Sequence, residues 1–174
     1  INSSYVILPG VGAFGNAMKQ IEKYNLHNTI LEYAKSNKPL LGICLGMQIL
    51  LTVSYEFGVH KGLGLIEGKV IKISNEKNKE IKIPHMGWNE IYPNNNKKEW
   101  KNKILKNSSI GKSFYFVHSF VCITKDYDST IAVCNYSDIS IPAVVATGNV
   151  FGCQFHPEKS ADNGLAVLKN FCEI

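Results

Sequence analysis

The sequence lacks most of the features that mark metal-binding, secreted and membrane-spanning proteins. Its 5 cysteines include no C-x-x-C pair, so neither a zinc site nor a disulfide framework is indicated. No signal peptide is recognisable. The most apolar segment, 39–53, contains Gln48 and two glycines and is too short to cross a bilayer. We therefore predict a protein of the reducing cytoplasm, with no metal, cofactor or membrane association.

Basic residues are in excess, but their arrangement does not favour nucleic-acid binding. The chain has 19 Lys and Arg against 14 Asp and Glu, a net charge of +5. Many lysines fall in 75–82 and 94–103, where Trp100 is the sole aromatic residue. Nucleic-acid surfaces interleave several aromatics with basic residues. We interpret both segments as solvated loops and a surface helix, and predict no nucleic-acid partner.

The length and apolar content fit one domain spanning 1–174. With 174 residues and 45% hydrophobic residues, the chain can bury a sizeable core, and it shows no repeat or linker. The apolar pattern in the first third of the sequence predicts a strand at 4–8, helices at 14–24 and 26–36, a strand at 39–43 and a helix at 44–57. This alternation is typical of an α/β fold, a parallel sheet flanked by helices.

The composition of the sequence changes from Gly58 onward, where glycines become frequent. We interpret this part as antiparallel strands added to the α/β core, followed by a helix over 160–172 that Ser160 can cap. The predicted strands are 69–73, 80–83, 114–118, 120–124, 130–135, 143–147 and 150–155.

Cys44 lies between a predicted strand and a predicted helix, flanked by Gly42 and Gly46. This is the cysteine version of the G-x-S-x-G elbow that exposes a nucleophile on a tight, strained turn. The flanking glycines let neighbouring backbone pass closely. A helix N-terminus would lower the pKa of the thiol. The alternative is a buried core cysteine, and this motif alone does not decide between them.

The segment 151–160 supplies a candidate base. His156 and Glu158 are two residues apart in a predicted extended segment, so both side chains can face the same side. A carboxylate on one ring nitrogen would fix the tautomer and leave the other to take a proton from Cys44. A surface His and Glu at a strand end is the alternative.

A glycine-rich loop follows the first strand. Gly10, Val11 and Gly12 stand at the expected carboxyl end of that strand, where loops of parallel sheets line sites. Their N–H groups, with that of Leu45, could stabilise an oxyanion. A plain turn or a phosphate loop is the alternative. Taken together, the three motifs predict a Cys-His-Glu acyl-transfer site.

Five segments over nearly the whole chain carry a family resemblance: LPGVGAFG, LLGICLGMQIL, IPHMGWNEI, FYFVHSF and GCQFHPEKS. With them the chain resembles the class I glutamine amidotransferases, most closely the glutaminase subunits of imidazole glycerol phosphate synthases. The resemblance implies L-glutamine as substrate, and Cys44 as nucleophile, His156 as base and acid, and Glu158 as the orienting carboxylate. It also implies glutamine contacts through Gly12, Gln48, Glu56 and the main chain at Ser119 and Phe120.

The placement of Gln48 and Glu56 also follows in part from the residues themselves. Both fall on the helix predicted over 44–57, eight residues apart and so roughly on one face. A surface acid is the alternative for Glu56.

The resemblance further implies a heterodimer with a (β/α)₈-barrel cyclase that receives the ammonia. The residues implied at or near this interface are Met86, Trp88, Asn89, Tyr115 and Lys159. For the aromatic residues and Met86, ordinary packing is the alternative.

The chain departs from the family pattern in two places. The family has a further strand and helix before the position of Ile1, so we expect a truncated domain whose sheet is one strand short. Phe120 stands where the family commonly has Tyr, which matters little if the contact is made by the main chain.

Three alternative functions stay open beside glutamine hydrolysis for histidine biosynthesis. A paralogous glutaminase could supply ammonia for the amidation of surface-glycan sugars. A different cysteine hydrolase, such as a peptidase or a γ-glutamyl hydrolase, would leave Gln48 and the segment IPHMGWN without a role. A non-catalytic docking subunit would not need an intact triad.

Overall fold

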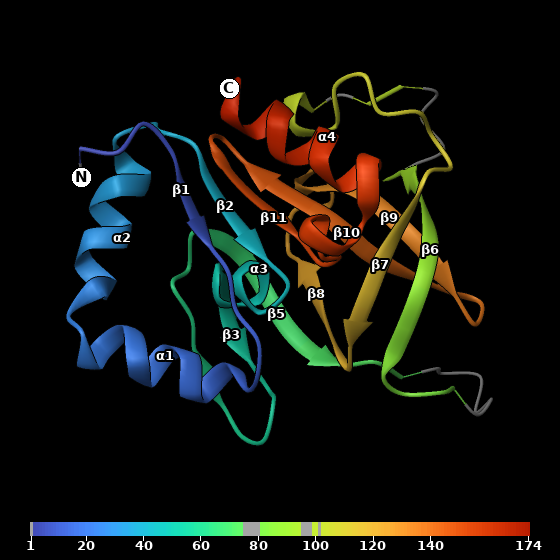
Figure 1. The fold of residues 1–174 in the computed structure, drawn as a ribbon. Helices are drawn as coiled ribbons and strands as arrows, with labels where there is room; N and C mark the ends of the chain where they lie inside the picture. Colours follow the sequence, from blue (N-terminus) through green and yellow to red (C-terminus); the bar gives the residue numbers. More distant parts are fainter. Residues whose placement is uncertain (1, 75–80, 95–98, 101) are drawn as a thin grey trace.

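A large mixed sheet forms the centre of the molecule in the computed structural model, which describes residues 2–74, 81–94, 99–100 and 102–174 (Figure 1). Its spatial order is β1 (Val6–Leu8), β2 (Leu40–Ile43), β11 (Val150–Cys153), β10 (Ile139–Thr147), β9 (Thr130–Tyr136), β6 (His85–Pro93) and β7 (Ser113–His118). The first three strands are parallel, and the others pair antiparallel. The predicted α/β class with antiparallel additions is therefore confirmed.

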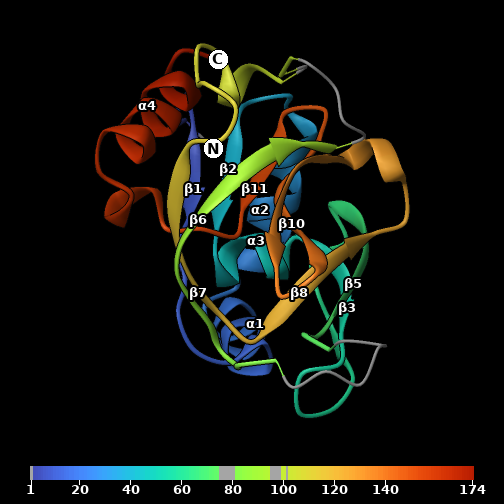
Figure 2. The same ribbon diagram turned by 90° about the vertical axis from the view of Figure 1, so that its right-hand side faces the viewer.

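A second, smaller sheet has the order β4 (His60–Lys61), β3 (Leu51–Ser54), β5 (Ile66–Lys72) and β8 (Phe120–Thr124). The helices are α1 (Phe14–Lys23), α2 (Leu26–Lys35), α3 (Leu45–Ile49) and α4 (Ala161–Cys172), with 3₁₀ turns η2 (Lys103–Leu105), η3 (Tyr127–Ser129) and η4 (Pro157–Lys159). Turned by 90°, the molecule presents the β6–β7 pair toward the viewer (Figure 2).

The central strands are buried on both faces. Leu40 and Val150 belong to the core that contains residues of α1 and α2, whereas Leu41 and Phe151 belong to the core that contains residues of α4. Alternate residues of a strand point to opposite faces, which explains the continuous apolar runs of β2 and β11. The helices accordingly lie on opposite sides of the parallel strands (Figure 1).

The parallel strands bring the three sequence motifs to one edge. Leu8 pairs with Gly42, and Gly42 pairs with Gly152, so β1, β2 and β11 end side by side. The glycine loop follows β1, Cys44 follows β2, and His156 lies three residues beyond β11. Because the carboxyl ends of parallel strands share an edge, this topology alone gathers the motifs.

Two predicted elements are wrong. The helix expected over 44–57 ends at Ile49, because Leu51–Ser54 forms β3 and pairs with β4 and β5; the β-branched Thr52 and Val53 suit this strand. Residues 81–83 of the strand expected at 80–83 are not in a strand. The strand begins instead at His85, after Pro84, since proline cannot donate to a ladder.

The lysine-rich segments are only partly described. Residues 75–80, 95–98 and 101 lie outside the described residues, and with them most of the predicted solvated loops and surface helix. That interpretation therefore stays a prediction.

The close packing at the elbow gives a stability prediction. In Gly46→Ala the added Cβ would stand 1.7 Å from the Leu8 carbonyl oxygen, a main-chain atom that cannot move without displacing β1. We expect the free energy of unfolding in urea to fall by about 3 kcal/mol or more.

A matched control is Gly148→Asn, in the turn between β10 and β11. Gly148 has a φ of +57°, and a Cβ there would meet no described atom within 4 Å. Asparagine tolerates this conformation, so we expect a loss of less than about 1 kcal/mol. Equal losses in the two variants would contradict the close-packing argument.

Candidate active site

Cys44 occupies the predicted elbow. It joins β2 to α3 with φ 53° and ψ −109°, a strained conformation for a residue with a side chain. A Cβ at Gly42 would come within 2.5 Å of the Gly46 carbonyl group, so the turn closes only with glycine at both flanking positions. The prediction of a sharp strand–turn–helix at Cys44 is therefore confirmed in geometry.

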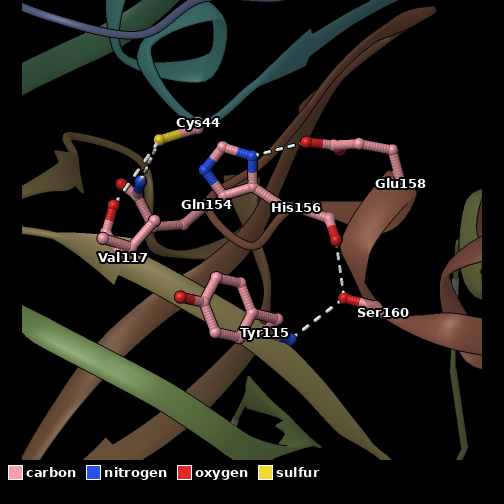
Figure 3. Close-up of polar contacts among 7 residues, drawn as sticks. All are labelled: Cys44, Tyr115, Val117, Gln154, His156, Glu158 and Ser160. Carbon is pink, nitrogen blue, oxygen red and sulfur yellow. Dashed lines mark hydrogen bonds and ion pairs between the residues drawn. The ribbon is translucent and has the colours of Figure 1, made fainter.

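The Cys44 thiol is buried and hydrogen-bonded to protein groups. Its Sγ donates to the Val117 carbonyl oxygen at 3.9 Å and accepts from Gln154 Nε2 at 3.7 Å (Figure 3). Burial is the main cause that raises the pKa of this thiol to about 11, and the charge of Glu158 also raises it. Hydrogen bonds from the Leu45 N–H and from Gln154 lower the pKa by less.

The expected lowering of the Cys44 pKa is thus wrong for this state of the molecule. The helix that was to supply a favourable dipole, α3, has only 5 residues. Its field is therefore small, while the side chain of Cys44 is withdrawn from water and only 8% of the residue is exposed. Loss of hydration disfavours the thiolate more than the short helix favours it.

His156 and Glu158 are paired as the sequence predicted. Nδ1 of His156 lies 2.7 Å from Oε1 of Glu158 (Figure 3). The other ring nitrogen, Nε2, is buried and has no hydrogen-bond partner among the described residues. A carboxylate on Nδ1 holds the hydrogen there, so Nε2 is left as a proton acceptor.

The extended segment expected to include both residues reaches only His156, whose φ is −97° and ψ 98°. Glu158 lies in the 3₁₀ turn η4, and His156 occupies the N-cap position of that turn without a side-chain capping bond. Pro157 occupies its first position, where proline suits a helical start. The tight turn, and not strand alternation, brings the imidazole and the carboxylate together.

The edge of β7 holds His156 in place. The Tyr115 carbonyl accepts from the His156 N–H at 2.9 Å, and the Tyr115 N–H donates to Ser160 Oγ at 2.9 Å. Ser160 in turn donates to the His156 carbonyl at 2.6 Å (Figure 3). Ser160 is fully buried, so this ring of hydrogen bonds fixes the main chain of the histidine.

The glycine loop packs against the start of α3. A Cβ at Gly10 would stand 3.2 Å from Leu45 Cβ, and Gly12 has a φ of +98° that favours glycine. Val11, Gly12 and Leu45 line the same pocket as Cys44. The residues expected to form an oxyanion site are thus adjacent to the nucleophile.

This pocket has a volume of about 700 Å³. Gln48, Glu56, Ser119 and Phe120 line it, as do Cys44, His156 and Lys159. Because α3 ends at Ile49, the reasoning that placed Gln48 and Glu56 on one helix is wrong, although both side chains reach the pocket.

Glu56 and Gln48 are each held by a specific contact. Glu56 Oε2 accepts from the Phe14 N–H at 2.6 Å, which satisfies one of the free N–H groups at the start of α1. Gln48 Nε2 donates to the Phe120 carbonyl at 3.1 Å and to Gln154 Oε1 at 3.2 Å.

The residues expected at a partner interface divide between two faces. Met86 and Trp88 are 59% and 53% exposed, and Trp88 lies directly opposite Tyr115 with ring centroids 6.2 Å apart. Asn89 is on the opposite face of β6 by its register, where its side chain contacts His85. Lys159 is exposed and lines the pocket.

Sequence reasoning missed several groups around the nucleophile. Gln154 and the Val117 carbonyl contact the thiol, and His118 and Lys72 line the pocket. Gln154 could have been suspected, since it lies between the end of β11 and His156. The others come from β5 and β7, whose position beside the elbow no local pattern reveals.

No group of three or more His, Cys, Asp or Glu among the described residues is placed to hold a metal ion. Within the same residues, no helix has the length and apolar character needed to cross a membrane.

The raised pKa of Cys44 gives a measurable pH dependence. Only the thiolate reacts with iodoacetamide, and with a pKa of about 11 its fraction rises with pH throughout the range 7–9.5. We expect the alkylation rate of Cys44, followed by peptide mass spectrometry, to rise about tenfold per pH unit without a plateau. The exposed Cys172 serves as an internal control for the reagent, and a plateau for Cys44 below pH 9 would contradict this expectation.

Comparison with known proteins agrees with the geometry. The family model of glutamine amidotransferase class-I matches residues 2–174. The chain is 43% identical to the imidazole glycerol phosphate synthase subunit HisH 1 of Legionella pneumophila, covering 100% of this chain and 83% of that protein. It is 48% identical to subunit HisH of Wolinella succinogenes, covering 97% and 80%.

Solved structures show the same fold at lower identity. The structure of PurLQS from Thermotoga maritima superposes with a TM-score of 0.67 at 21% identity, covering 98% of this chain and 79% of that one. A crystal structure of a glutamine amidotransferase gives 0.62 at 19% identity, covering 97% and 79%. With the family model matched from residue 2 to residue 174, this chain belongs to the class I glutamine amidotransferase family.

Proposed function

We propose that this chain is a glutaminase that hydrolyses L-glutamine to glutamate and ammonia and delivers the ammonia to a cyclase subunit forming imidazole glycerol phosphate. The observation that carries the proposal is the buried Nε2 of His156, which has no hydrogen-bond partner among the residues that the structure describes. Glu158 holds this ring in the same pocket as the elbow cysteine. The relatives named as imidazole glycerol phosphate synthase subunits support the pathway.

Cys44 acts as the nucleophile in the first half-reaction. Its proton passes to His156 Nε2, and Sγ attacks the side-chain amide carbon of glutamine. The N–H groups of Leu45 and of the loop at Gly10–Gly12 stabilise the oxyanion that forms. His156 then gives its proton to the departing nitrogen, so that ammonia leaves and a thioester remains on Cys44.

Water completes the reaction in the second half. His156 takes a proton from the water molecule, whose oxygen attacks the thioester carbonyl, and the same two donors stabilise the second oxyanion. The C–S bond breaks, the proton returns to the sulfur, and glutamate is released. Glu158 keeps the imidazole in the required tautomer and stabilises its transient positive charge.

The pocket walls suit the polar ends of glutamine. Glu56 has one carboxylate oxygen on the Phe14 N–H and lines the pocket, where it can attract the substrate ammonium group. Gln48, Gly12 and the main chain at Ser119 and Phe120 complete the proposed contacts. The resting thiol is neutral, so its proton has to pass to His156 as Sγ attacks the bound glutamine.

A substitution of the nucleophile tests the reaction. In Cys44→Ala we expect glutamine-dependent ammonia release by the purified complex to fall by at least about 10⁴-fold, because no other thiol can form the thioester. Cys172→Ala, which changes an exposed cysteine at the end of α4, should keep the wild-type rate. Ammonia-dependent synthesis should survive in both, and glutaminase activity in Cys44→Ala would rule out the assignment.

The proposed docking surface for the cyclase is the outer face of β6 and β7. It presents Met86, Trp88 and Tyr115, and the two first residues are more than half exposed. Large exposed apolar side chains that share a face mark interaction sites, and tryptophan is common among residues that dominate binding energy. We further propose that the barrel cyclase covers the mouth of the pocket near the exposed Lys159. The complex is proposed to act in the cytoplasm.

Truncation of Trp88 tests this surface. We expect Trp88→Ala to weaken binding to the cyclase by about 2 kcal/mol, or roughly thirtyfold in Kd, with no change in the urea midpoint of the isolated chain. Tyr24→Ala, at the exposed corner between α1 and α2, is the matched aromatic control. Titration against a sugar-amidating synthase in parallel separates the two pathways, since only the true partner should stimulate glutaminase activity.

A further inference from the structure

Two buried histidines, His118 at the pocket wall and His85 behind it, form a hydrogen-bonded row. His118 Nδ1 lies 2.9 Å from the Phe120 carbonyl oxygen, and His118 Nε2 lies 2.9 Å from His85 Nδ1. At the outer end, His85 Nε2 lies 2.9 Å from Oδ1 of Asn89. The proposed reaction uses neither histidine, yet every ring nitrogen of the pair has a partner.

The rings are held rigidly and away from water. His85 is fully buried, and His118 is 6% exposed. The His85 ring stacks on Phe116 and Tyr136, with centroid distances of 4.9 Å and 4.1 Å. Burial is the main cause that lowers the pKa of both imidazoles, that of His118 to about 4, so both rings are neutral near pH 7.

Neutral rings fix the direction of every hydrogen bond. A carbonyl only accepts, so His118 Nδ1 must carry the hydrogen that it donates to Phe120. His118 Nε2 is then an acceptor, and His85 must donate from Nδ1. His85 Nε2 becomes an acceptor in turn, so the Asn89 amide must turn its NH₂ toward it. That turn gives up the 3.4 Å hydrogen bond that Asn89 Nδ2 donates to the Asn135 carbonyl.

The row continues beyond Phe120 to the nucleophile. The same carbonyl accepts a hydrogen bond from Gln48 Nε2 at 3.1 Å, and Gln48 Nε2 also donates to Gln154 Oε1 at 3.2 Å. Gln154 Nε2 donates to Cys44 Sγ at 3.7 Å. Both amide hydrogens of Gln48 are thus committed, and its orientation depends on where the Phe120 carbonyl lies.

We infer that His85 and His118 are positioning residues that fix the Phe120 carbonyl and, through it, the Gln48 side chain at the wall of the glutamine pocket. This inference rests on the proposed glutaminase function, because it gives Gln48 a substrate contact. Hydrogen bonds in a row polarise one another, so a donor lost at His85 weakens the contact at Phe120. The Nε2 atom of His118 would then be buried without a hydrogen-bond partner.

The test compares two variants at His85 in the complex with the cyclase. His85→Phe keeps a ring of similar size against Phe116 and Tyr136 but removes the donor to His118. His85→Asn retains an amide donor near the position of Nδ1. We expect His85→Phe to raise the KM for glutamine about tenfold with less than a threefold change in kcat, and His85→Asn to restore most of the wild-type KM.

The controls separate positioning from a loss of folding. His27→Phe, a partly exposed histidine on α2, should leave KM unchanged, and Tm is recorded for every variant. A purely structural role would lower Tm in both His85 variants without the KM pattern. An unchanged KM in folded His85→Phe, or equal impairment in His85→Asn, overturns the inference.

A spectroscopic measurement on the wild-type chain is independent of catalysis. With ¹⁵N-labelled histidine, we expect His85 and His118 to give the spectra of neutral rings with the hydrogen on Nδ1 at pH 7. A hydrogen on Nε2 of His118, or a charged ring, overturns the inference even where His85→Phe fails to fold. Failure of the proposed function would appear separately, as a wild-type complex that releases no ammonia from glutamine.

Discussion

The approach of the elbow to the end of β1 is the constraint on which the site depends. Gly46 lies so close to the Leu8 carbonyl that no side chain fits between them, and a Cβ at Gly42 would come within 2.5 Å of the Gly46 carbonyl group. This contact locks β1, β2 and α3 together and holds Cys44 in a conformation that costs about 1–3 kcal/mol. The strain persists because the surrounding residues, Leu40, Leu41 and Leu45, are buried in the two cores on either side of the sheet.

Burial at the same elbow has two opposing effects on the reaction: it disfavours the thiolate and it strengthens contacts with the substrate. Withdrawal from water raises the pKa of Cys44 to about 11, so the resting side chain is a neutral thiol bound to Val117 and Gln154. The same withdrawal strengthens every electrostatic contact that a bound substrate makes there. A base with a free lone pair is therefore essential, and His156 Nε2 is the buried ring nitrogen that the described residues leave without a partner.

The sequence predicted what depends on local chemistry and missed what depends on pairing. The glycines around Cys44 and the short spacing between His156 and Glu158 each determine the local geometry within a few residues. The sequence therefore predicted both the sharp turn and the His–Glu pair. The helix expected over 44–57 was overextended because Leu51–Ser54 is drawn into a sheet by β4 and β5, which no local periodicity encodes. The pKa of Cys44 was misjudged for the same reason: burial by distant β7 and β11 outweighs a helix whose length was overestimated. The His85–His118 contact joins residues 33 apart in the chain, so spacing gave no sign of it.

Strand β7 lies between the proposed docking surface and the active site. One of its edges pairs with β6, and the other edge forms hydrogen bonds to residues of the site. On its free edge, the Ser113 carbonyl accepts from Asn163, Tyr115 holds His156 and Ser160, and the Val117 carbonyl accepts from the Cys44 thiol. Edge strands normally need protection against pairing with other chains, and here the residues of the site supply it. The side chain of Tyr115 belongs to the proposed docking surface, together with Met86 and Trp88 on the paired strand β6. Because the main chain of β7 holds His156 and accepts a hydrogen bond from Cys44, a displacement of β7 by a docked partner would change the position of the base relative to the nucleophile.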